Sequence, residues 1–126
     1  MAYIKDGYLY HAGCCIASNY VDTLIYEVAK LWKAMGIDIE DTKKAMIPLL
    51  RSVIDNLENN PLDNCLTGPI SRNDVRTVEG HLEVIKGKCP EMLKMYQMLG
   101  KETVDYALSN GQLTKEEAEV LKEKLS

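Results

Sequence analysis

Apolar residues recur at helical spacing along most of this chain, and no segment alternates apolar and polar residues. A period of 3.6 residues gathers apolar side chains on one helix face, whereas a half-buried strand needs a period of two. The longest such stretch covers residues 11–35. One side of it carries Ile16, Ala17, Tyr20, Leu24, Val28, Leu31 and Met35. The pattern predicts an all-α fold with a long, central first helix.

Four further helices are expected, giving about five in all. The second covers residues 39–58 with Pro48 inside it, and the third runs from Ser71 or Asn73 to about residue 87. The first ten residues, with a glycine and three tyrosines, look like an extended linker. The helical domain is therefore expected to span residues 11–126.

The last two helices are marked by capping signals. Pro90 suits the first turn of the fourth helix. Gly100 lies in the middle of that helix, where glycine is unfavourable and usually indicates a close helix crossing. Thr114 and Glu117 have the spacing of a capping box, which predicts that a short fifth helix begins there.

Composition limits the classes of partner. A chain of 126 residues is long enough for one domain with a real core. The net charge is −4 and no basic cluster occurs, so neither nucleic acid nor an anionic membrane is an expected partner. No apolar run approaches the roughly 20 residues of a membrane helix. No signal peptide is recognised at the start, and we expect a cytoplasmic protein.

The sequence contains no motif for binding a metal ion or a nucleotide. The cysteines at 14, 15, 65 and 89 form no Cys-x-x-Cys pair, and the two histidines lie far apart, so we expect free thiols and no metal site. The glycines never form Gly-x-Gly, and no Gly-Lys-Ser/Thr occurs. No cofactor-binding residue is therefore expected in this chain.

Residues 10–20 carry the first candidate site. On a helix, His11, Cys15, Ser18 and Asn19 fall on one face, together with Asp22. An imidazole can donate a proton to a carbonyl or imine that is being reduced, and an amide and a hydroxyl can orient its oxygen. The alternative is an ordinary polar helix face in solvent.

Residues 65–74 carry the second candidate site. Thr67, Gly68 and Arg72 could bind an anionic group, because the loop brings backbone N–H groups and a guanidinium to a helix N-terminus. The alternative is structural: Thr-Gly-Pro is a turn, and residues 71–74 cap the following helix.

Both stretches resemble the C-terminal helical domain of an oxidoreductase family labelled domain of unknown function 2520. That domain opens with a Tyr-His-Ala-Ala-like motif running into Ala-Ser-Asn-Tyr, and a Thr-Gly-Pro-Ile/Val-x-Arg-Gly-Asp motif follows. Asn73 stands where the family prefers glycine. The matching residues are Tyr10, His11, Ala12, Ala17, Ser18, Asn19, Tyr20, Pro48, Leu49, Thr67, Gly68, Pro69, Ile70, Arg72, Asp74, Thr77, Val78, His81, Leu82, Tyr96, Leu99 and Gly100.

The resemblance implies kinship to the helical domains of pyrroline-5-carboxylate reductase, ketopantoate reductase and 6-phosphogluconate dehydrogenase. In those enzymes the helical domain dimerises and closes the substrate site over the nicotinamide. By this resemblance the chain is a homodimeric substrate-capping domain that is inactive alone. The NAD or NADP would be held by a Rossmann domain located upstream or on a separate polypeptide.

The resemblance also suggests roles for the two motifs. His11 and Asn19 are the candidate catalytic residues, and the candidate substrate-binding residues are Ser18, Thr67, Gly68 and Arg72. If they form one site, the side chain of His11 or Asn19 should lie within ~10 Å of the 67–72 loop, a span that a small ligand can bridge. The alternative function is a non-catalytic helical homodimer that serves as a scaffold or interaction module.

Overall fold

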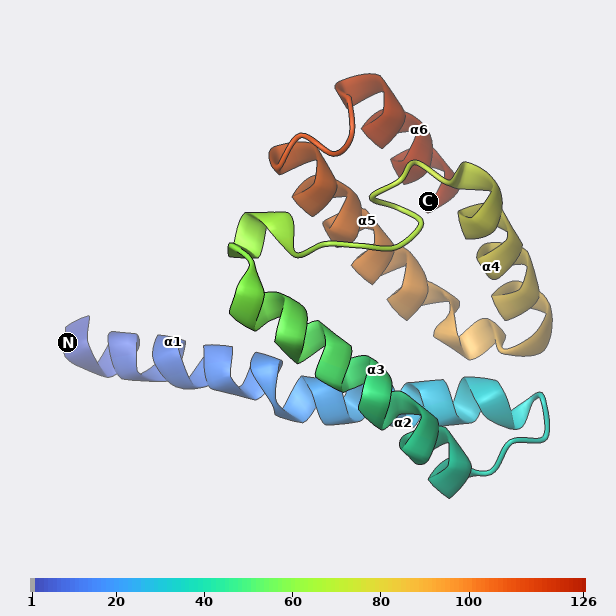
Figure 1. Ribbon diagram of the computed structural model, residues 1–126, viewed down its shortest axis with the longest axis horizontal. Helices are drawn as coiled ribbons and strands as arrows, with labels where there is room; N and C mark the ends of the chain where they lie inside the picture. The colour runs from blue at the N-terminus through green and yellow to red at the C-terminus, as the bar shows by residue number, and fades with distance from the viewer. Residues whose placement is uncertain (1) are drawn as a thin grey trace. The chain divides into compact units, whose positions relative to one another are not determined.

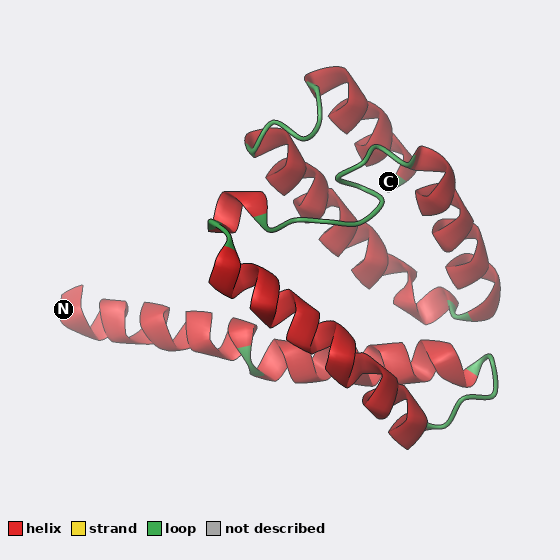
Figure 2. Ribbon diagram, in the orientation of Figure 1, coloured by secondary structure: helices red, strands yellow, loops and turns green. Residues whose placement is uncertain are grey.

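The computed structural model describes residues 2–126, with side chains from Lys5 onward, and consists of helices joined by loops (Figures 1 and 2). None of these residues forms a strand, so the all-α prediction is confirmed. The α-helices are α1 (Ala2–Ala17), α2 (Asn19–Lys33), α3 (Ile39–Asn59), α4 (Val75–Lys88), α5 (Leu93–Ser109) and α6 (Lys115–Lys124), and two short 3₁₀ turns, η1 (Leu62–Asn64) and η2 (Pro90–Met92), precede α4 and α5 respectively.

The long first helix is confirmed, with two differences. It consists of α1 and α2, which follow each other with a break at Ser18 alone. The extended conformation expected for residues 1–10 is wrong from Ala2 onward, because α1 already begins there. Adding residues to an existing helix is far easier than nucleating one, and no proline interrupts this segment. Gly7 costs only about 1 kcal/mol relative to alanine, which the continuous helix tolerates.

The chain divides into two compact units, residues 1–48 and residues 49–126. The division falls inside α3, directly after Pro48. A proline within a helix removes one backbone hydrogen bond, because it has no N–H to donate to the preceding turn. Each unit is described separately below.

Residues 49–126 contain a well-defined core. It is formed by Val78 of α4, Val104 and Ala107 of α5, and Ala118 and Leu121 of α6. Three residues outside the helices complete it: Ile70 before α4, Leu113 before α6 and Leu125 after α6. Tyr96 and Leu82 pack against this cluster while remaining partly exposed. Ile70 thereby anchors the 65–74 loop in the core.

Gly100 and Leu125 approach each other closely in this core. A Cβ atom added at Gly100 would lie 2.8 Å from Leu125 Cδ2, closer than a real methyl group can approach, and 3.1 Å from Leu125 Cδ1. The close approach expected at Gly100 is therefore present, and the partner is the residue that follows α6.

Residues 1–48 bury far fewer side chains. Ala29 of α2 is buried, as are Thr42 and Met46 of α3. Asp38 caps α3, because its Oδ1 accepts hydrogen bonds from the backbone N–H of Glu40 at 2.8 Å and from that of Asp41 at 3.0 Å. Large apolar side chains along α1 and α2 remain 60–78 % exposed: Tyr8, Leu9, Tyr10, Ile16 and Tyr20. This unit therefore presents an extensive apolar surface.

Candidate functional site

The first predicted site lies where α1 ends and α2 begins. Ser18 leaves the helical conformation, with φ −122° and ψ −68°, and its hydroxyl donates to the carbonyl of Cys14 at 2.6 Å. Asn19 Oδ1 lies 3.5 Å from Ser18 Oγ, and His11 Nε2 lies 3.8 Å from Cys15 Sγ. These contacts form two separate pairs, His11 with Cys15 on α1 and Ser18 with Asn19 at the start of α2.

The groups of this first site are open to their surroundings. His11, Ser18 and Asn19 are exposed, and Cys15 is half-buried. An exposed imidazole and an exposed amide can both reach a ligand, and neither side chain lines the two hollows beside α2 and α3, which are bordered by Tyr26, Ala29 and Ile39. Chemically, this surface can donate a proton and hydrogen bonds to a carbonyl placed over it.

The second predicted site is a tight loop leading into α4. Gly68 adopts φ +97°, and its carbonyl accepts a hydrogen bond from the Ser71 hydroxyl at 2.8 Å. The backbone N–H of Asp74 then donates to the carbonyl of Pro69 at 2.8 Å. A φ in this range favours glycine, which explains the residue type at position 68.

Asn73 explains the departure from the family's glycine. It has φ +54°, a left-handed conformation that asparagine tolerates better than most residues. Its side-chain amide donates to Glu117 Oε2 at 2.9 Å, a contact that glycine could not make. The other amide atom, Oδ1, is buried without a hydrogen-bond partner. Asn73 thus ties the loop to the first turn of α6.

Asp74 caps α4, which corrects the predicted start of that helix. The helix begins at Val75 rather than at Ser71 or Asn73. Asp74 Oδ1 accepts from the backbone N–H of Thr77 at 3.1 Å, and Oδ2 accepts from the Thr77 hydroxyl at 2.7 Å. These hydrogen bonds, and then the nearby Arg72 and Arg76, hold the pKa of Asp74 below its ordinary value. The helix terminus therefore already carries a carboxylate.

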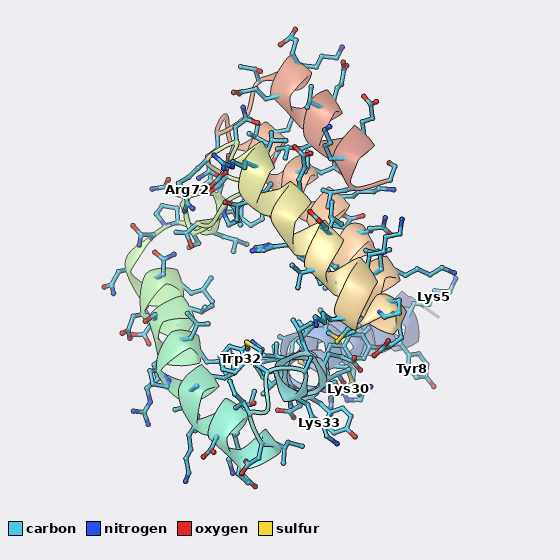
Figure 3. All side chains as sticks on the ribbon, turned by 90° about the vertical axis from the view of Figure 1, so that its right-hand side faces the viewer. Lys5, Tyr8, Lys30, Trp32, Lys33 and Arg72 are labelled. Carbon is cyan, nitrogen blue, oxygen red and sulfur yellow. The ribbon has the colours of Figure 1, made fainter. Side chains whose placement is uncertain are left out.

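The structural alternative therefore explains part of the second motif. Gly68, Ser71 and Asp74 make the turn and the cap, whereas Arg72 and Thr67 take no part in the hydrogen bonds that hold them. Both of these side chains are exposed, and Arg72 extends from the loop in Figure 3. Arg72 remains the group best suited to bind an anion.

The two predicted sites belong to different units of the chain. His11, Ser18 and Asn19 lie within residues 1–48, whereas Thr67, Gly68 and Arg72 lie within residues 49–126. That they border one cleft stays a prediction.

A groove in the second unit was not predicted from the sequence. This groove has a volume of about 500 Å³ and is lined mainly by apolar side chains of α3 and the loop after it, including Leu49, Val53, Leu57, Leu62 and Leu66. Thr67 and Tyr106 also line it. The sequence predicts the apolar stripe of α3. It does not predict a groove there, because an apolar stripe that borders a groove has the same pattern as one that packs against the core.

A histidine–tyrosine pair was also missed. His81 Nδ1 lies 2.8 Å from the hydroxyl of Tyr96, with the two rings edge to face at 5.8 Å between centroids. Burial raises the pKa of Tyr96. The pair joins α4 to α5. The sequence does not show that these two helices pack against each other, so it does not predict that the two side chains meet.

The described part of the chain contains neither a candidate metal site nor a helix that could span a membrane. Among the described residues, no three His, Cys, Asp or Glu side chains converge in a way that could hold a metal ion. Within the same part of the chain, every helix is too short or too polar to cross a membrane.

Comparison with known proteins identifies the family. The family model described as domain of unknown function (DUF2520) matches residues 4–103, which include both predicted sites and most of α5. No curated protein and no solved structure matches the chain. Because the match extends over most of its length, the chain belongs to the DUF2520 family.

Proposed function

We propose that this chain is the C-terminal substrate-capping and dimerisation domain of an NAD(P)-dependent oxidoreductase. The observation that carries the proposal is the set of exposed polar side chains at the α1–α2 junction, inside the stretch that the family model matches. His11 lies on α1 and Asn19 begins α2, and both side chains are exposed and can be reached by a ligand. The similarity to reductase helical domains noted above adds support.

In the proposed reaction a hydride passes from a nicotinamide to the carbon of a carbonyl or imine. A proton must then reach the oxygen or nitrogen, and His11 is the group in this chain suited to donate it. Ser18 and Asn19 would orient the accepting atom, and Arg72, with Thr67 and Gly68, would hold an anionic part of the substrate. The dinucleotide-binding fold would be supplied by an upstream segment or a separate polypeptide.

Self-association is the second part of the proposal. Five large apolar side chains of α1 and α2 are 60–78 % exposed: Tyr8, Leu9, Tyr10, Ile16 and Tyr20. Together they offer about 600 Å² of apolar area, with an aromatic side chain counted at about 200 Å². A stable dimer buries about 800 Å² on each partner, so these residues with their neighbours would suffice. Two-fold symmetry is the commonest closed arrangement.

The same apolar surface favours a second candidate function, a non-catalytic homodimeric scaffold. The two candidates differ in what they require of His11. A scaffold needs the apolar residues of α1 and α2 but has no use for an exposed imidazole.

Reconstituted turnover tests the proposal. The chain is co-expressed with the polypeptide encoded immediately upstream, and oxidation of NADH and NADPH is followed with a panel of small carbonyl and imine substrates. His11→Gln should lower turnover by about 100-fold, the usual effect of losing a proton donor. Lys33→Gln, an exposed change elsewhere on α2, is the matched control. Equal activity of the two variants, or no turnover with either cofactor, would refute the enzymatic proposal and leave the scaffold.

A further inference from the structure

The groove of the second unit has properties that go beyond the two predicted motifs. Its apolar walls are Val53 and Leu57 of α3 and Leu62 and Leu66 of the following loop, and no Asp, Glu, Lys or Arg lines it. A volume of about 500 Å³ is within the range of small-molecule sites.

Three of the polar side chains along this groove are engaged within the protein. The Asn56 side-chain amide donates to the carbonyl of Cys65 at 2.6 Å, and the Tyr106 hydroxyl donates to the carbonyl of Leu62. The Cys65 thiol donates to the carbonyl of Pro61 at 3.2 Å. Since these donors are satisfied within the protein, the groove offers a ligand mainly apolar contact.

The same hydrogen bonds make the groove preformed. Segment 62–66 is held at Leu62 by Tyr106, at Cys65 by Asn56, and at Leu66 by Gln112, whose amide donates to the Leu66 carbonyl at 3.0 Å. These side chains come from α3, α5 and the loop after α5. A wall fixed from three places needs little ordering when a ligand binds.

Charge differs between the two ends of the lining loop. Asp63 lies beside Leu62 and Tyr106, where its carboxylate repels an anion. Thr67 lines the groove further along the loop, and the chain then turns at Gly68–Ser71 to present Arg72. A negative group on a ligand is therefore disfavoured at the Asp63 end of the loop, and the next cationic side chain along the chain beyond Thr67 is Arg72.

We infer that the groove binds the apolar body of an amphipathic carboxylic acid, with the carboxylate at Arg72. This inference rests on the proposed function for the role of Arg72 and adds the substrate class: an acid with an extended apolar chain rather than a small polar acid.

The test uses a series of straight-chain carboxylates, from butanoate to octanoate, titrated into the full chain and followed by amide chemical shifts. Each added methylene that enters the groove should raise affinity about two- to fourfold. Octanol, which has the same body without the charge, should bind more weakly than octanoate. The shifted amides should cluster at residues 53–57 and 62–67.

Two variants of equal exposure separate the groove from the rest of α3. Val53 is 51 % exposed and lines the groove, whereas Ile54 is 53 % exposed and does not. Val53→Glu should abolish the dependence on chain length, and Ile54→Glu should leave it intact. Arg72→Gln should weaken all carboxylates by a similar factor and leave octanol unchanged.

Each contrary result has its own meaning. Equal behaviour of Val53→Glu and Ile54→Glu would overturn the assignment of the groove. An unaltered preference for octanoate over octanol in Arg72→Gln would overturn the assignment of the carboxylate. A change of oligomeric state in Val53→Glu by light scattering would mean that a protein surface fills the groove, which also overturns the inference. None of these results depends on nicotinamide turnover, so failure of the proposed enzyme is detected separately.

Discussion

Gly100 and Leu125 allow a sharp test of how the second unit is packed. Replacing Gly100 with alanine favours the helix by about 1 kcal/mol, because glycine is a poor helix former. The new methyl group, however, would lie 2.8 Å from Leu125 Cδ2, and Leu125 is fully buried. Overpacking a core costs about 1–3 kcal/mol. Gly100→Ala should therefore destabilise the protein by about 0–2 kcal/mol.

The sign should reverse when Leu125 is shortened. Leu125→Ala alone should cost about 2–5 kcal/mol, because it leaves a cavity among α5 and α6. In that background the alanine at position 100 meets no clash and keeps its helical advantage. Gly100→Ala should then stabilise the protein by about 1 kcal/mol.

Urea unfolding of the four proteins measures this double-mutant cycle. Far-UV circular dichroism reports the transition, and hydrogen exchange of core amides in α5 confirms that the second unit is the part affected. The expected coupling energy is about 1–3 kcal/mol. If Gly100→Ala has the same effect in both backgrounds, Leu125 does not limit the space at Gly100 and the packing described here is wrong.

Four further predictions concern single features. Asn73→Ala should cost about 2–3 kcal/mol, because it loses the hydrogen bond to Glu117 and strains a positive φ, and Asn73→Gly should cost less in the same urea assay. The pKa of Asp74 lies below its ordinary value in the folded protein, so ionised Asp74 stabilises the fold above the ordinary pKa, and this stabilisation is lost as the pH falls through the folded-state pKa. Asp74→Asn keeps a capping side chain without the charge and should make the unfolding free energy depend less on pH in this acidic range. Thr114→Ala breaks the capping box with Glu117 and should lower the unfolding free energy by about 1 kcal/mol, with Thr114→Ser as the control that retains it. Calorimetry with NADH or NADPH and this chain alone should detect no binding tighter than roughly millimolar, and a micromolar constant would contradict the proposed division of labour.

Local signals in the sequence predicted the helices well. The capping box at Thr114 and Glu117 is present. It depends on residues within one turn of each other, so its chemistry can be read from adjacent positions. The start of α4 was placed too early because Ser71 and Asp74 are both good caps, and only the turn at Pro69 decides between them.

Features that depend on distant residues could not be predicted. The carbonyls of Leu62 and Leu66 are held by Tyr106 and Gln112, which are 44 and 46 residues away. Asn73 reaches Glu117 over 44 residues in the same way. A pattern gives the face of each helix but not the partner that the face meets.

The central claim is that the two motifs of this chain serve one substrate site. A crystal structure of the assembled protein measures it directly, through the distance from the side chain of His11 or Asn19 to the 67–72 loop. The account predicts a distance within ~10 Å, either in one chain or across a two-fold interface, since a single small ligand must touch both. If the loop lies at the opposite end of the domain from both residues in every assembly, the shared site does not exist.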